Sequence, residues 1–94
     1  MKRLDWDEAK NLQLKSERGV SFEDVQVALK ARALLDNIAH PNQKQYPGQR
    51  LLIVNIKGYA FVEPFVEDEQ KVFLKTIYPS RKFTKKYLIE RRRQ

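Results

Sequence analysis

Six side chains in this sequence have the chemistry that phosphodiester cleavage requires. Cutting RNA by its own 2′-hydroxyl needs a base for the hydroxyl proton, cations for the charge on the phosphate, and an acid for the leaving oxygen. Glu63 is the candidate base. Arg50 and Arg81 are candidates for the phosphate clamp, since a guanidinium binds two phosphate oxygens together. The candidate acids are Tyr59, Tyr78 and His40.

These side chains meet only if their strands pair in one register. Lys57-Gly58 predicts a two-residue hairpin turn. The turn pairs Ile56 with Tyr59, Val54 with Phe61, Leu52 with Glu63 and Arg50 with Phe65. Arg50, Tyr59 and Glu63 then share a face, which a turn at 67–70 extends with Val72, Leu74, Thr76 and Tyr78. The other face would sit against the helices and leave the Glu63 face open; it holds Leu51, Ile53, Ala60, Val62, Phe73 and Ile77. Asn55 and Lys75 also fall on this second face and do not fit cleanly, and a one-residue slip would exchange the two faces.

Two helices are expected before these strands. Asp5 is a candidate N-cap for a first helix, which Gly19 would end in the left-handed conformation. Ser21 is expected to cap a second helix that runs to about Arg32. Their apolar positions fall at helical spacing, so both helices are expected to pack on a sheet.

The rest of the chain predicts four strands and a last helix. The strands are expected at 34–39, 50–56, 59–66 and 72–78, with a polar loop at 40–49 and the helix from Arg81 to about Arg92. Pro64 lacks an amide donor, so the third strand must be bulged or unpaired there. The order predicts one α+β domain over residues 1–94, a four-stranded antiparallel sheet whose second face is open.

Composition excludes several classes of protein. The 94 residues suit one small domain, and 33% of them are charged. The chain has no cysteine and one histidine, which excludes a disulfide scaffold and argues against a metal site, so we expect no cofactor. No apolar run approaches the roughly 20 residues of a spanning helix, and the N-terminus is unlike a signal peptide. We therefore expect a cytoplasmic protein without a membrane partner.

The positive charge lies at the C-terminal end. Residues 1–79 hold 12 basic and 11 acidic side chains. Residues 80–94 hold Glu90 and seven cations: Arg81, Lys82, Lys85, Lys86, Arg91, Arg92 and Arg93. Such a field attracts polyanions, which fits RNA, DNA or an acidic protein. A solvated tail that keeps the protein soluble is the alternative.

Two stretches resemble a known family. Residues 6–11 (WDEAKN) with 18–24 (RGVSFED), and residues 77–84 (IYPSRKFT), resemble the BrnT family of toxins, which has a RelE-like nuclease fold. Family members carry paired basic residues where Arg81 and Lys82 stand here. They often carry histidine at the position of Arg18, so this chain departs from the pattern there.

The resemblance implies a toxin of a type II toxin–antitoxin system. Such a toxin is a metal-independent endoribonuclease that cleaves RNA and inhibits translation, and a cognate antitoxin protein holds it inactive. DNA is bound only indirectly, through the antitoxin. Arg81 and Lys82, at the matched positions, are the best candidates for contacts to RNA. Apart from the resemblance, Lys85, Lys86 and His40 are further expected contacts to RNA.

Other interpretations stay open. In one interpretation, Glu63 and Arg50 form a cross-strand ion pair that has no catalytic role. The aromatic residues then serve packing or a protein interface. The whole chain would be a non-catalytic basic module that binds nucleic acid or an acidic protein, or a structural adaptor. A pure binder needs no carboxylate beside its cations, so a Glu63 that shares a face with Arg50 favours catalysis if the register holds.

Overall fold

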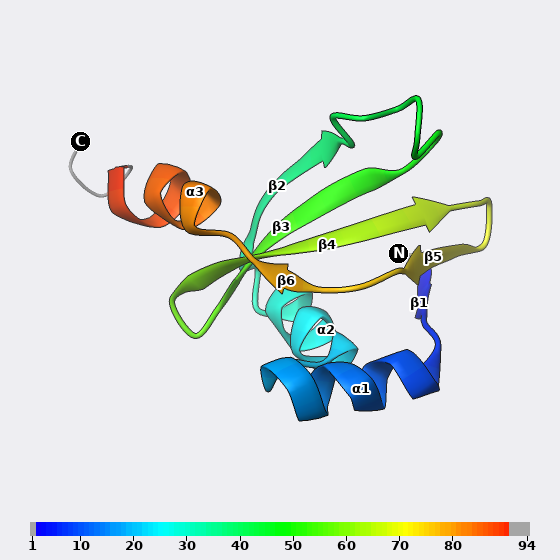
Figure 1. The fold of residues 1–94 in the computed structure, drawn as a ribbon, viewed down its shortest axis with the longest axis horizontal. Coiled ribbons are helices and arrows are strands. Elements are labelled where there is room, and N and C mark those ends of the chain that lie inside the picture. Colours follow the sequence, from blue (N-terminus) through cyan, green and yellow to red (C-terminus); the bar gives the residue numbers. More distant parts are fainter. Residues whose placement is uncertain (1, 91–94) are drawn as a thin grey trace.

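The computed structural model describes residues 2–90 and shows one sheet with helices around it (Figure 1). The strands are β1 (Arg3–Asp5), β2 (Leu34–Ala39), β3 (Arg50–Ile56), β4 (Tyr59–Glu67), β5 (Lys71–Leu74) and β6 (Tyr78–Pro79). The helices are α1 (Glu8–Arg18), α2 (Phe22–Lys30) and α3 (Arg81–Thr84), and α3 continues as the π-helical segment η1 (Lys85–Ile89). The protein is therefore α+β, as predicted.

The sheet is mixed, and this corrects the predicted four-stranded antiparallel arrangement. Its order is β1-β5-β4-β3-β2, with β6 paired to β4, and β1 runs parallel to β5. Asp5 was predicted to cap the first helix but is the last residue of β1, opposite Phe73. The cap is Asp7, whose carboxylate accepts from the N–H of Ala9 at 2.9 Å. Pairing with a distant strand thus overrides the local capping signal.

Most local signals are confirmed. Gly19 ends α1 with φ 66°, and Ser21 caps α2 in a reciprocal capping box with Asp24, although α2 ends at Lys30, before the predicted end. Lys57 and Gly58 both have positive φ, 55° and 84°, as a primed hairpin turn requires. The pairs between β3 and β4 are those predicted, from Ile56 with Tyr59 to Arg50 with Phe65.

The predicted fourth strand is broken in two. β5 ends at Leu74 and β6 begins at Tyr78, so residues 75–77 form a link without ladder pairing, called here the 75–77 link. The gap lies beside Pro64, whose carbonyl accepts from the N–H of Lys75 at 2.9 Å. The interruption expected at Pro64 is thus a gap in the neighbouring strand.

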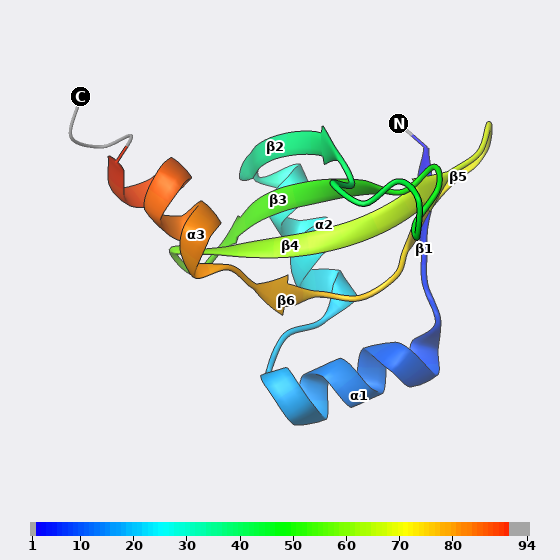
Figure 2. The ribbon, with the colours of Figure 1, turned by 45° about the horizontal axis from the view of Figure 1, so that its top comes forward.

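The helices α1 and α2 cover the face that was expected to be open. Figure 2 shows α2 behind the strands. This α1–α2 face packs Leu52, Val54 and Phe65 against Phe22 and Val25 in one buried cluster. The predicted assignment of the two faces was therefore wrong, although the register was right. The reason is that this face carries large apolar side chains between its polar ones.

The opposite face, called here the α3 face, is covered in part by α3 and η1. Leu51, Ile53, Ala60 and Val62 form a second cluster there with Tyr87, and Phe83 packs against it. The side chain of Ser80 caps α3, as predicted, by accepting from the N–H of Phe83 at 3.1 Å. The predicted end of this helix, near Arg92, lies outside the described residues. A wholly open sheet face is therefore absent from the part of the chain that the structure describes.

The hairpin turn gives a test of the backbone. Gly58→Ala should lower the free energy of unfolding by about 1 kcal/mol, because a Cβ disfavours the left-handed conformation that the turn needs. Urea denaturation followed by circular dichroism measures the change. Lys57→Gly is the matched control and should shift stability by less than about 0.5 kcal/mol, because relief of strain offsets the added chain entropy.

Candidate nucleic-acid interface

A groove on the α3 face brings together two of the predicted site residues. It has a volume of about 260 Å³, and its lining comes from the 40–49 loop, β4, the 75–77 link and β6. Figure 2 shows the loop that follows β2 in front of the strands, on the side away from α2. We call this hollow the tyrosine groove; its lining residues are His40, Tyr46, Gln49, Pro64, Lys75, Thr76 and Tyr78.

The 40–49 loop is ordered by its own polar contacts. The His40 ring packs on Tyr46 with centroids 4.5 Å apart. Its Nδ1 accepts from the N–H of Asn42 at 3.0 Å, which leaves the ring proton of the neutral form on Nε2. The side-chain amide of Gln43 donates to the carbonyls of His40 and Gln49, at 2.8 and 3.0 Å. His40 can therefore present a hydrogen-bond donor to a bound group.

Two tyrosines expose their rings beside this histidine. Tyr46 and Tyr78 are each 37% exposed. Burial raises the pKa of Tyr78, and Tyr46 adds to the effect. Tyr78 therefore keeps its phenolic proton at neutral pH and can donate it. Tyr78 pairs with Val62 and so lies on the α3 face, apart from the Glu63 face to which it was assigned.

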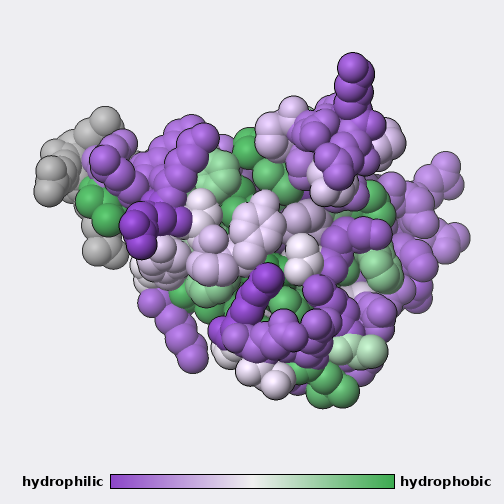
Figure 3. Space-filling model, in the orientation of Figure 1, coloured by the Kyte–Doolittle hydropathy of each residue, from purple (hydrophilic) through white to green (hydrophobic). Residues whose placement is uncertain are grey.

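One cation, Lys75, lines the tyrosine groove, and further cations lie on α3 and η1, which pack on the same face of the sheet. The Nζ of Lys75 lies 5.5 Å from the centroid of the Phe73 ring. On α3 and η1, the Nζ atoms of Lys82 and Lys86 lie 5.7 and 5.1 Å from the rings of Phe83 and Tyr87. All four predicted cations of this region, Arg81, Lys82, Lys85 and Lys86, are exposed. Figure 3 shows hydrophilic side chains over α3, with paler and more hydrophobic surface beside them.

Glu63 is absent from this groove, and its predicted role as a base was wrong. Its side chain is 0% exposed on the α1–α2 face. Oε2 accepts from the N–H of Lys75 at 3.1 Å, and Oε1 has no hydrogen-bond partner among the described residues. Burial raises the pKa of Glu63 to about 9, against the opposing effect of the Lys75 and Thr76 amides. At neutral pH this carboxyl group is protonated and out of reach of a substrate.

Arg50 and Tyr59 also lie outside the groove. The guanidinium of Arg50 donates to the side chain and carbonyl of Asn37, at 3.0 and 3.1 Å, on the edge strand β2. Among residues 2–90, it forms no salt bridge with Glu63, so the alternative of a cross-strand ion pair is wrong too. Tyr59 is 36% exposed at the hairpin and packs edge-on against Phe61. Neither residue lines the groove.

Arg18 occupies the position where the resembled family often has histidine. Its Nη1 donates to the carbonyl of Ile77, at the end of the 75–77 link. The residue therefore ties α1 to the edge of the sheet.

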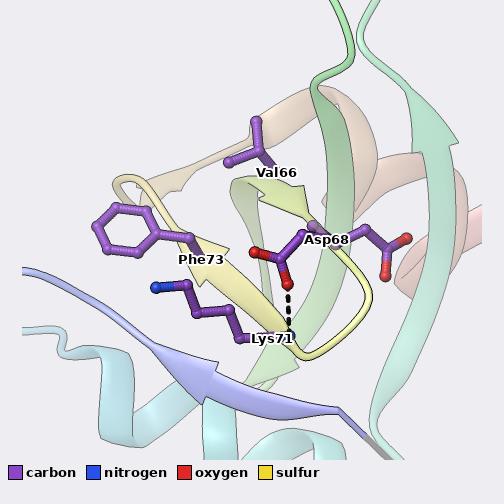
Figure 4. Close-up of a pocket in the computed structure, with 5 residues that line it drawn as sticks. Val66, Asp68, Lys71 and Phe73 are labelled. Carbon is purple, nitrogen blue, oxygen red and sulfur yellow. Dashed lines mark hydrogen bonds between the residues drawn. The ribbon is translucent and has the colours of Figure 1, made fainter.

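A larger hollow lies at the turn between β4 and β5 (Figure 4). Its volume is about 330 Å³, and Val66, Phe73 and Lys71 help to line it. The carboxylate of Asp68 accepts from the backbone N–H groups of Gln70 and Lys71, at 2.8 and 2.9 Å. These bonds lower the pKa of Asp68 and are sufficient to explain it as a turn residue. This hollow has no convergent set of proton donors.

No family model, curated protein or solved structure matches the chain. The assignment of a function therefore rests on geometry and on the sequence resemblance. Within residues 2–90, no three metal-ligating side chains come together, and no helix there is long and apolar enough to span a bilayer.

Sequence reasoning missed Lys75 and Tyr46. Lys75 was assigned to the helix-covered face, where it did not fit, and that misfit was a signal that the strand is irregular. Tyr46 stands between polar residues in a loop, and exposed loop aromatics often mark a binding surface.

The buried Glu63 carboxyl group makes stability depend on pH. Between pH 4.5 and 9 the unfolded chain has lost a proton that the folded protein keeps, so stability should fall by about 1.4 kcal/mol per pH unit from this group. Glu63→Gln should remove this slope and stabilise the protein increasingly as the pH rises. Urea titrations at pH 5, 7 and 8.5 measure it. Glu67→Gln, at an exposed site, is the control and should keep the wild-type slope.

Proposed function

We propose that the protein is a type II toxin that binds RNA in the tyrosine groove and cleaves it without a metal ion. One observation carries the proposal: His40, Tyr46, Tyr78 and Lys75 converge on one groove, on the face of the sheet where α3 packs and exposes its cations. The resemblance of residues 6–11, 18–24 and 77–84 to the BrnT family supports it independently.

The groove offers defined roles for its residues. Lys75 and Arg81 hold the phosphate and stabilise the charge that builds on it. Tyr78 or His40 donates a proton to the leaving oxygen. Aromatic rings beside cations also suit unstacked bases, since every base has a face that can stack. The 2′-hydroxyl proton passes to water, because the described part of the groove has no carboxylate, and we expect slow cleavage.

The burial of Glu63 favours a second candidate, a module that binds RNA without cutting it. Both candidates use the same groove and the same cations, so binding alone does not separate them. A cognate antitoxin protein remains the proposed partner of the toxin. It would be expected to bind the shared promoter DNA, so that the toxin meets DNA only through it.

Binding is tested by removing the paired cations at the start of α3. The double substitution of Arg81→Ala with Lys82→Ala should weaken binding of a 12-nucleotide single-stranded RNA. It should also reduce the slope of log Kd against log salt concentration by about the amount that two phosphate contacts contribute. Fluorescence anisotropy at several salt concentrations measures both. Lys10→Ala with Lys30→Ala, on α1 and α2, is the charge-matched control. Equal losses in both pairs would show that only net charge matters.

Cleavage is tested by removing one hydroxyl group. Tyr78→Phe should slow RNA cleavage by about 100-fold, the contribution of a general acid, while RNA binding stays within twofold. Gel assays of cleavage and growth curves after induction in bacteria give the two readouts. Tyr59→Phe, at the hairpin, is the control and should cleave like the wild type. A wild-type protein that binds RNA but neither cuts it nor arrests growth would establish the non-catalytic module.

A further inference from the structure

The 75–77 link forms one wall of the tyrosine groove. Lys75 and Thr76 line the groove on the α3 face. Ile77 is 0% exposed and belongs to the cluster on the α1–α2 face. The link therefore crosses from one face of the sheet to the other, and its backbone path decides where Lys75 lies.

Groups on the α1–α2 side hold the backbone of the link. The N–H of Lys75 is shared between the carbonyl of Pro64, at 2.9 Å, and Oε2 of Glu63, at 3.1 Å. The amide of Thr76 also acts on the Glu63 carboxyl group. Arg18 donates to the carbonyl of Ile77. In a continuous ladder a neighbouring strand would supply acceptors for the amides and donors for the carbonyls, whereas Pro64, which has no N–H, can supply only its carbonyl as an acceptor.

We propose that Glu63 is a positioning residue, whose buried carboxyl group fixes the Lys75–Thr76 wall of the groove from the opposite face of the sheet. This role rests on the proposed function, because the wall matters to RNA only if RNA binds there. Glu63 touches no substrate and acts through the backbone of Lys75.

Stability does not explain the carboxyl group. A carboxyl group that is wholly buried, with one oxygen unpaired, costs free energy that an apolar side chain of similar size avoids. What an apolar side chain cannot provide is an acceptor for the amides of the link. Glu63 therefore trades stability for a defined backbone path beside the groove.

The test compares Glu63→Leu with Glu63→Gln at pH 7. Leucine removes the acceptor, and glutamine keeps one. Amide hydrogen exchange at residues 75 and 76 reports the link directly, and anisotropy with the 12-nucleotide RNA reports the groove. Thermal melting establishes that both variants fold. Because burial keeps Glu63 protonated at this pH, neither substitution changes the net charge.

The Glu63→Leu variant should melt at or above the wild-type temperature. The amides of residues 75 and 76 should nevertheless exchange at least about tenfold faster in this variant than in the wild type. Its affinity for RNA should fall about fivefold, with an unchanged salt dependence. Glu63→Gln should restore both properties to within about twofold of the wild type.

Two results would overturn the role of Glu63, and they differ from each other. If Glu63→Leu exchanges and binds RNA like the wild type, the positioning role is wrong while the RNA groove stands. If the wild-type protein binds no RNA, the proposed function is wrong. The role of Glu63 in RNA binding is then wrong as well, whatever the exchange rates show.

Discussion

The structure depends on an interruption of the hydrogen-bond ladder beside Pro64. β4 pairs with β3 along its length, but on its other side it pairs with β6 before Pro64 and with β5 after it. Proline offers no donor to that side. The adjacent chain leaves the ladder after Leu74, where the N–H of Lys75 is shared between the Pro64 carbonyl and the Glu63 carboxyl group, and it rejoins the sheet at Tyr78.

This interruption places the cations of the candidate interface. The crossing of the link turns Ile77 into the core and Tyr78 toward the α3 face. Ser80 then caps α3, and Phe83 and Tyr87 pack the helical segment onto the second apolar cluster. The paired cations at 81 and 82 consequently lie on the same side of the sheet as the 40–49 loop. A local defect in one strand thus joins two parts of the chain that are far apart in sequence.

The sequence predicted what short-range chemistry determines. The capping box of Ser21 and the turn at Lys57-Gly58 involve residues a few positions apart, so their signals are complete in the local sequence. The pairing of β1 with β5 joins residues 3–5 to residues 71–73, far apart in the sequence, and no local signal specifies it. The hairpin turn predicted the register of β3 and β4 correctly, but period-two patterning left open which face the helices cover. Both faces of this sheet are apolar, as Leu52 on one and Ile53 on the other illustrate.

The structure brings His40 and Tyr78 together in one groove, whereas Glu63 lies on the covered face of the sheet. Glu63 was misplaced because the sequence did not show which face the helices cover. Glu63 shares its face with Phe61, Phe65 and its cross-strand neighbour Leu52, so all four are covered or exposed together. Covering the three apolar side chains contributes roughly 1.5–3 kcal/mol each. Protonating the carboxyl group at pH 7 costs only about 3 kcal/mol, given its ordinary pKa of 4.5. Burial of the apolar residues prevails, and the carboxyl group is buried with them as a neutral acceptor.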